Sequence, residues 1–324
     1  MMYSDNAINI LTTKTFKGIG RAWIIKNLKG NESVATIVSL LHREGFQISP
    51  DDFARDKEKI SESIKRLEGF IDGVVAIGDK DFPPHRGKVK NSEQPIFLFY
   101  RGDLSLLKST NKNVAVIGLL NPDTDIEIIE QEVVTELVKN GATVISGLAL
   151  GCDSIAHRQA LLSNGKTVAI LPSPLNNILP ATNKELANEI FRNNGLLITE
   201  YYADVNSKME LGSRYQERDR LQALFSDSII LSASYAKNDQ GNDSGSRLAM
   251  EYALNYSIPR AVIYDSVSDV NNPKYDLSRQ LISEQKEITI INRSNLSVTV
   301  KKIMSNKPDI KITQTYQSNL FDSM

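Results

Sequence analysis

Small and cationic residues that could hold a phosphate group recur in the second half of the chain. Ser146, Gly147 and Gly151 separate an apolar run from a helical pattern, where glycine lets a ligand approach the backbone and a helix start offers free N–H groups to an anion. Arg218 and Arg220 could each bind a phosphate in bidentate fashion. The full set of candidate phosphate-binding residues is Gly118, Ser146, Gly147, Gly151, Lys184, Arg218, Arg220, Ser244, Gly245, Ser246 and Arg247.

These residues also have structural explanations. Glu217 and Asp219 flank the two arginines in sequence and would neutralise them in a solvated turn. Ser244 could cap the helix that follows it, which is compatible with phosphate binding there. Glycine after a strand also suits a tight turn into a helix. The binding interpretation gains weight because the candidates converge on one edge of the expected sheet.

No catalytic or metal-binding residue is expected. Asp153 and His157 lie four residues apart, and we expect the first to cap a helix and the second to make a structural hydrogen bond. Cys152 is the single cysteine, so an internal disulfide and a cysteine-built metal site are excluded. With no activating base evident nearby, it is expected to be a buried thiol. No cofactor is expected.

The elements that must position the candidates alternate between strand and helix from residue 113 onward. The expected strands are 114–118, 142–145, 167–171, 196–199, 228–232 and 260–264, and the expected helices are 125–139, 153–163, 183–193, 216–225 and 246–255. Such alternation indicates a parallel sheet covered by helices on both faces. Ligands of such sheets bind beyond the carboxyl ends of the strands, where Gly118, Gly147 and Gly151 fall.

The flanking regions are less regular. Residues 6–69 have helical patterns, and two short strands are expected at 70–77 and 95–100. After residue 265 we expect a turn and a short helix within 271–282, an edge strand at 288–291 and a helix at 298–304. The chain is therefore predicted to be an α/β protein, a Rossmann-like doubly wound parallel sheet with a small helical N-terminal domain. The predicted divisions are 1–107 for that domain with its short pre-core strands, 108–304 for the Rossmann-like core and 305–324 for a flexible tail.

Bulk composition excludes several classes of protein. The chain has 324 residues, 41% hydrophobic and 24% charged, which is typical of a globular protein. Its formal net charge is −1, so nucleic-acid binding would depend on a local patch. An apolar run long enough for a transmembrane helix and a signal-peptide pattern are both missing, so a cytoplasmic protein with no membrane contact is expected.

Ordered motifs along the chain resemble the DNA-processing protein A (DprA, or Smf) family. S-G-L-A-L-G-C-D-S-I-A-H at 146–157 is similar to the family signature S-G-L-A-R-G-I-D-x-x-A-H. L-P-A-T-N at 179–183 resembles its Y-P-x-x-N, and R-D-R-L-Q-A-L-F-S at 218–226 resembles its R-N-R-I-I-A-G-L-S. S-G-S at 244–246 and the upstream I-G-D-K-D-F-P at 77–83 also match. The resemblance covers roughly residues 16–264.

The resemblance implies a function without catalysis. Members of the family bind and protect single-stranded DNA and hand it to a RecA-type recombinase during DNA uptake and recombination, usually as homodimers. The chain is therefore expected to bind single-stranded DNA in competence, DNA recombination or phage defence.

Two departures from the family pattern concern cations. The family has G-S-R after its first core strand, whereas Leu119 and Leu120 follow Gly118 here. Leu150 stands in place of the signature arginine. The loss of two phosphate contacts predicts weaker DNA binding with a flatter dependence on salt.

Two other classes of function remain open. Related Rossmann-like proteins bind free nucleotides, and some hydrolyse nucleoside monophosphates through a P-G-G-x-G-T-x-x-E motif. The segment D-S-G-S-R-L-A-M-E at 243–251 lacks the glycines and the threonine of that motif, and Glu251 is its only candidate acid. A protein-interaction adaptor that has lost ligand binding is the third possibility.

The tail carries a candidate partner motif. Gln317, Leu320 and Phe321 form a Q-x-x-L-F pattern, which resembles the peptide that bacterial replication proteins insert into the sliding clamp. The glutamine would anchor the peptide, and the Leu-Phe pair would fill an apolar pocket. Binding to the sliding clamp through this motif is therefore a hypothesis from the sequence.

Overall fold

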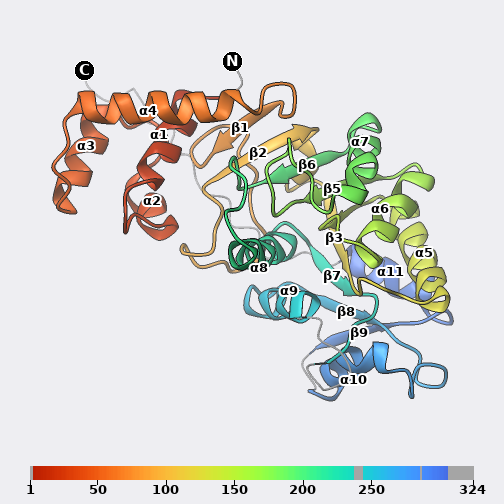
Figure 1. The fold of residues 1–324 in the computed structure, drawn as a ribbon. Coiled ribbons are helices and arrows are strands. Elements are labelled where there is room, and N and C mark those ends of the chain that lie inside the picture. The colour runs from red at the N-terminus through yellow and green to blue at the C-terminus, as the bar shows by residue number, and fades with distance from the viewer. Residues whose placement is uncertain (1–2, 237–243, 285–286, 306–324) are drawn as a thin grey trace, which may run out of the picture.

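The computed structural model describes residues 3–236, 244–284 and 287–305 (Figure 1). In it, the stretches with strand periodicity form one nine-stranded sheet, and the stretches with helical periodicity form the helices around that sheet. The strands are β1 (Gly73–Ala76), β2 (Phe97–Gly102), β3 (Lys112–Ile117), β4 (Ala142–Ser146), β5 (Lys166–Ile170), β6 (Leu196–Thr199), β7 (Ser228–Leu231), β8 (Arg260–Ile263) and β9 (Ile288–Ile291). They lie in the order β1-β2-β6-β5-β4-β3-β7-β8-β9.

The sheet is doubly wound, as predicted. β3 to β9 pair in parallel, and from β3 the chain builds β4, β5 and β6 on one side and β7, β8 and β9 on the other. The direction of winding therefore reverses between β3 and β7. Crevices at such reversal points are the usual binding sites of open α/β sheets.

Helices cover both faces of the sheet because alternate strand residues point to opposite sides. In β3, Val114 and Val116 pack into one apolar cluster, while Ala115 and Ile117 pack into another. One face is covered by α8 (Lys208–Leu224), α9 (Ser244–Asn255) and α10 (Asp276–Ser283). The other is covered by α5 (Thr124–Lys139), α6 (Cys152–Leu162), α7 (Lys184–Arg192) and α11 (Leu296–Ser305).

The N-terminal helices share a core with part of the sheet. They are α1 (Asp5–Lys14), α2 (Arg21–Asn27), α3 (Val34–Arg43) and α4 (Pro50–Lys65). The last begins with a capping box between Ser49 and Asp52 and has proline in its first turn, which explains its sharp start. Apolar residues of these helices join one cluster with Leu197 of β6 and Ile190 of α7.

The two short pre-core strands extend the main sheet. β1 and β2 pair antiparallel, and β2 pairs antiparallel with β6. β1 and β2 thus lie in the same sheet as the core strands, although the predicted chain division at residues 107 and 108 groups them with the N-terminal helices. That division stays a prediction. None of the helices in the described ranges is long and apolar enough to span a bilayer.

The main difference from the expected elements concerns α8. The helix was expected over 216–225 but begins at Lys208, where the side chain of Ser207 accepts a hydrogen bond from the N–H of Glu210. The first part of the helix consists mostly of polar residues and Gly212, so it lacks the apolar periodicity from which helices were predicted. The expected edge strand at 288–291 is present as β9.

Candidate functional site

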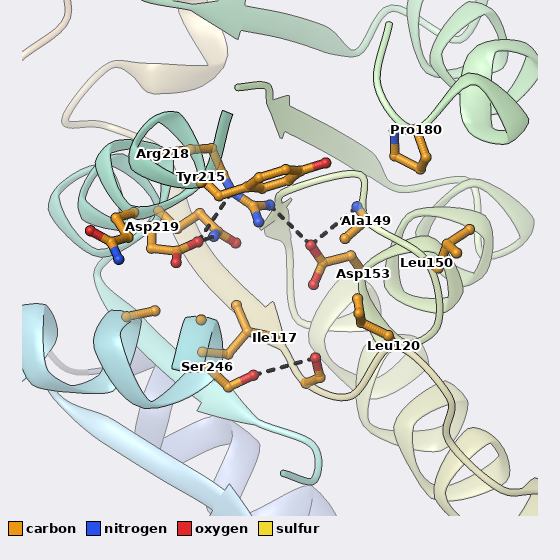
Figure 2. Close-up of a pocket in the computed structure, with 16 residues that line it drawn as sticks. Ile117, Leu120, Ala149, Leu150, Asp153, Pro180, Tyr215, Arg218, Asp219 and Ser246 are labelled. Atoms are coloured by element: carbon orange, nitrogen blue, oxygen red, sulfur yellow. Dashed lines mark hydrogen bonds and ion pairs between the residues drawn. The ribbon is translucent and has the colours of Figure 1, made fainter. Parts of the chain in front are cut away.

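A pocket of about 510 Å³ opens where the sheet reverses its winding (Figure 2). It is formed by the carboxyl end of β3, the loop between β4 and α6, the inner side of α8 and the start of α9. Four of the predicted binding residues line it: Gly118, Arg218, Gly245 and Ser246. The pocket lies at the edge of the sheet where the sequence argument placed the candidate residues.

The loop between β4 and α6 is held tightly against its neighbours. Gly151 has φ +69°, and a side chain there would overlap the carbonyl oxygen of Leu119. The amide of Asn183 donates to the carbonyl oxygens of Leu148 and Ala149, at 2.9 and 3.0 Å. Glycine at 151 and the buried asparagine therefore set the loop that forms one wall of the pocket.

Arg218 lies between two carboxylates on the pocket wall. Its Nη1 is 3.2 Å from Oδ2 of Asp153, and its Nε is 3.1 Å from Oδ1 of Asp219. Burial lowers the pKa of Arg218, but the two carboxylates outweigh it and hold the pKa above its ordinary value. The guanidinium stays charged, and two protein anions already surround it.

Asp153 organises the loop instead of capping α6. Its Oδ2 accepts hydrogen bonds from the N–H groups of Gly147 and Ala149, at 3.1 and 3.3 Å. The helix itself begins after Gly151 without a side-chain cap, so the cap expected from Asp153 was wrong. Burial raises the pKa of Asp153, while Arg218 and the hydrogen bond from Ala149 act in the opposite direction.

One face of α8 supplies most of the remaining wall. Gly212, Tyr215, Gln216, Asp219 and Gln222 recur at helical spacing and all line the pocket. The ring of Tyr215 lies 5.4 Å from the guanidinium carbon of Arg218. The amide of Gln222 donates to Asp219 at 3.0 Å, and its Oε1 is buried without a hydrogen-bond partner among the described residues.

The pocket mouth is apolar on one side. Leu120 and Leu150, on two adjacent loops, are 62% and 46% exposed and both line the pocket. Pro180 completes this part of the rim (Figure 2). On the opposite side, the hydroxyl of Ser246 donates to the carbonyl of Gly118 at 3.3 Å. The leucines occupy the positions where the family resemblance led us to expect arginines.

Arg220 is absent from the pocket lining, contrary to the expectation that it grips phosphate there. Its side chain is 1% exposed and forms an ion pair with Glu200, and it also donates to the carbonyl of Glu93. Glu217 lies 3.4 Å from its Nε. Successive residues point about 100° apart on a helix, so Arg218 and Arg220 face different surroundings.

The other predicted residues do not line the pocket. Ser146 is fully buried and donates to the carbonyl of Val116 at 2.7 Å, so its role is structural. Gly147 leaves room for Arg218.

Three further candidates lie at the start of α7 and in α9. Lys184 is exposed at the start of α7, directly after Asn183. Arg247 pairs with Glu251 along α9. Ser244 is the first residue of α9, and its side chain is outside the described part of the structure.

Buried polar groups lie next to the pocket, on the side of α5 and α6. Glu130 is fully buried, and burial raises its pKa to about 8, while the nearby polar groups of Cys152 and Ser232 act against that rise. Cys152 is buried as expected, and burial raises the pKa of its thiol. Nδ1 of His157 lies 2.6 Å from Oγ1 of Thr167, which confirms the structural hydrogen bond expected of that histidine.

Neither metal binding nor the hydrolase motif finds support in the described residues. Among them, no group of three or more His, Cys, Asp or Glu side chains is arranged to hold a metal ion. Glu251, the candidate acid of the hydrolase alternative, is exposed and paired with Arg247 outside the pocket.

Sequence reasoning missed Tyr215, Asp219 and Gln222 as pocket residues. Their i, i+4, i+7 spacing is the signal that could have found them, but it is visible only if the helix is extended towards residue 208. The tail motif Gln317, Leu320 and Phe321 lies outside the described residues.

Comparisons with known proteins agree with this fold. Residues 73–297 match the family model of the DNA recombination-mediator protein A. The Smf protein of Synechocystis sp. is 30% identical over 181 residues, 55% of this chain. The chain spans 42% of the length of that relative and 57% of the Smf protein of Borreliella burgdorferi.

Two solved structures share the fold. DNA processing protein A of Streptococcus pneumoniae superposes with a TM-score of 0.68 at 21% identity, covering 92% of this chain and 98% of that chain. DNA processing protein A of Helicobacter pylori, described for its single-stranded DNA binding mode, gives a TM-score of 0.55 at 28% identity and covers 71% of this chain and 96% of that one. With a family model matched over most of its length, this chain belongs to the family of the DNA recombination-mediator protein A.

Proposed function

We propose that this chain binds single-stranded DNA at the pocket where the sheet reverses its winding. The observation that carries the proposal is the position and lining of this pocket, which joins apolar and aromatic side chains to the start of α9 at the carboxyl end of β3. Family membership supports the same conclusion, as does the single-stranded DNA binding described for the Helicobacter pylori protein.

The chemistry of the rim suits a flexible strand. Leu120, Leu150 and the ring of Tyr215 offer apolar and aromatic surface to bases, and stacking on such surface tolerates any sequence. Gly245 and Ser246 bring the start of α9 to the opposite side, where backbone N–H groups favour a phosphate. Arg218 contributes positive charge but is already paired, so phosphates would lie at the rim.

The rim can be tested without disturbing the core. Leu120→Glu and Leu150→Glu place a negative charge at exposed positions, so the fold should persist while binding of a labelled oligonucleotide falls at least about tenfold. Leu162→Glu is the matched control. Leu162 is 76% exposed at the end of α6, the helix that follows the loop carrying Leu150, and it does not line the pocket. Binding that is equal in all three variants would contradict this site.

Family membership supports a proposal for the cellular role. The chain would pass its bound strand to a RecA-type recombinase in DNA uptake, recombination or phage defence, and would act as a homodimer without catalysing a reaction. Recombinase loading on strands covered by single-strand binding protein should be faster with this chain than without it. Light scattering of the free chain measures the oligomeric state, and a monomer at all concentrations would contradict the dimer.

A second partner rests on the sequence alone. Gln317, Leu320 and Phe321 would insert into the peptide pocket of the bacterial sliding clamp. Removing residues 317–324 should abolish clamp binding in surface plasmon resonance, and unchanged binding would reject the motif.

A further inference from the structure

The loop between β4 and α6 contains a leucine in a backbone conformation that leucine rarely adopts. Leu148 has φ +59°, in the left-handed region, where the Cβ atom crowds the backbone. Glycine would adopt this conformation freely. Leu148, however, is fully buried in the apolar cluster that includes Leu171 and Leu186, so its side chain fills space in the core. Such strain persists only where the surrounding structure holds it, and it is concentrated at functional sites.

Side chains from two neighbouring segments hold this loop. The amide of Asn183, a buried residue directly before α7, donates to the carbonyl oxygens of Leu148 and Ala149, at 2.9 and 3.0 Å. The hydroxyl of Ser154 on α6 donates to the same carbonyl of Ala149, at 2.8 Å. Asp153 accepts hydrogen bonds from two N–H groups of the loop. Residues outside the loop therefore fix the orientation of its peptide groups.

The loop held in this way forms part of the pocket mouth. Ala149 and Leu150 line the pocket, and almost half of the Leu150 side chain is exposed there. Asn183 and Ser154 do not line the pocket. An effect of these two side chains on the binding of a strand must therefore be transmitted through the loop.

We propose that Asn183 and Ser154 are positioning residues for strand binding, which hold the loop in its disfavoured conformation before a strand arrives. The strand then meets Ala149 and Leu150 already in place, and binding does not have to overcome the strain at Leu148. This inference rests on the proposed function. A chain whose loop is correctly placed for only a fraction of the time binds with that fraction of its affinity, so loosening the loop weakens binding in proportion.

Asn183→Ala removes two of the hydrogen bonds and leaves the strained leucine with less support. The dissociation constant for a labelled oligo-dT should rise about tenfold, because each lost bond shifts the equilibrium of the loop by roughly three- to fivefold. The change should lie in the association rate, since fewer chains are ready to bind, and the dissociation rate should stay within about twofold of the wild-type value. Stopped-flow fluorescence measures both rates.

Asn113→Ala is the matched control for losing a buried amide. Asn113 is fully buried near the start of β3, its amide donates to the carbonyl of Phe225 at 3.2 Å, and it does not line the pocket. This exchange should lower the midpoint of urea unfolding but leave both binding rates of the folded chain unchanged.

Ser154→Ala is a milder variant, which serves if Asn183→Ala does not fold. It removes one hydrogen bond to the loop, so its association rate should fall about threefold. Hydrogen exchange at residues 147–151 should be faster in both variants than in the wild-type chain. Unchanged exchange would contradict the hold on the loop.

The outcomes separate this inference from the proposed function. If the wild-type chain binds oligo-dT and both folded variants bind it with wild-type rates, the inference is overturned and the proposed function stands. A loss of affinity confined to the dissociation rate also overturns the inference, because it indicates direct contact with the strand. If the wild-type chain binds no oligonucleotide, the proposed function fails, and the role of the loop in binding fails with it.

Discussion

The guanidinium of Arg218 fills the space above Gly147 that a side chain there would need. A Cβ built on Gly147 would overlap Nη1 of Arg218 and lie 2.8 Å from Oδ2 of Asp153. The ion pair between Arg218 and Asp153, at 3.2 Å, therefore depends on glycine at a position 71 residues before the arginine in the chain.

Gly147→Ala should break this arrangement. The added methyl group expels Arg218 and leaves Asp153 without its cation in a buried site, which costs about 3–5 kcal/mol of unfolding free energy. Gly212→Ala is the control, because Gly212 also lines the pocket but nothing lies within 4 Å of a Cβ there. That exchange should raise stability by roughly 0.5–1 kcal/mol, since alanine favours a helix. Urea unfolding of both variants measures the contrast, and equal midpoints would refute it.

Arg220 should matter for stability and not for DNA contact. It joins Glu200 and Glu217 to Arg21 of α2, whose Nη2 lies 3.2 Å from Glu200 and 2.8 Å from Glu217. Arg220→Ala leaves the buried carboxylate of Glu200 with less compensation, so the unfolding free energy should fall by about 3–5 kcal/mol.

DNA binding by the folded fraction of the Arg220→Ala variant should remain, because Arg220 does not line the pocket. Arg293→Ala is the control for removing an arginine, since Arg293 pairs with Glu132 on the surface, and such exposed pairs contribute little. If a fully folded Arg220→Ala chain lost DNA binding, the prediction would be contradicted and Arg220 would belong to the DNA-binding site.

Glu130 should make stability fall as the pH rises. Its pKa of about 8 in the folded chain exceeds its ordinary value of 4.5, because burial disfavours the carboxylate. The folded chain therefore holds one more proton than the unfolded chain between these values. Its contribution is full below about pH 4.5 and decreases by about 1.4 kcal/mol per pH unit as the pH rises to about 8. Glu130→Gln should remove this pH dependence. The measurement is the unfolding free energy of both chains at pH 5, 6.5 and 8.

His157 should make the chain sensitive to acid. The hydroxyl of Thr167 donates to the carbonyl of Val144, so Nδ1 of His157 must carry a hydrogen and donate to Thr167. Burial, assisted by Arg218, lowers the pKa of His157 from 6.5 to about 3.

Between about pH 3 and 6.5, His157 therefore binds a proton in the unfolded chain but not in the folded chain. Stability attributable to His157 is present above about pH 6.5 and is lost as the pH falls towards 3, at about 1.4 kcal/mol per pH unit. The difference in unfolding free energy between wild type and His157→Gln isolates this effect from that of Glu130. A difference that stays constant between pH 4 and 7 would contradict it.

Local patterns in the sequence were sufficient for the fold. Apolar runs of four to six residues alternate with amphipathic helices, and burial on both faces follows from that alternation. The same reasoning placed Gly118 and Ser246 at one edge, because carboxyl ends of parallel strands meet there. Local patterns could not predict that β2 pairs with β6 and brings β1 into the sheet, because pairing between strands that are distant in the chain has no local signal.

The charged groups show where sequence reasoning ends. Arg218 and Arg220 are two residues apart and looked equivalent, yet one lines the pocket and the other is buried against Glu200 and a backbone carbonyl 127 residues away in the chain. The sequence by itself determined the sheet and its helical layers, since these depend on periodicity, and it predicted the edge that now holds the pocket. Only the tertiary structure decided which cations are already neutralised and which acceptors remain, because electrostatic partners come from segments that meet only on folding.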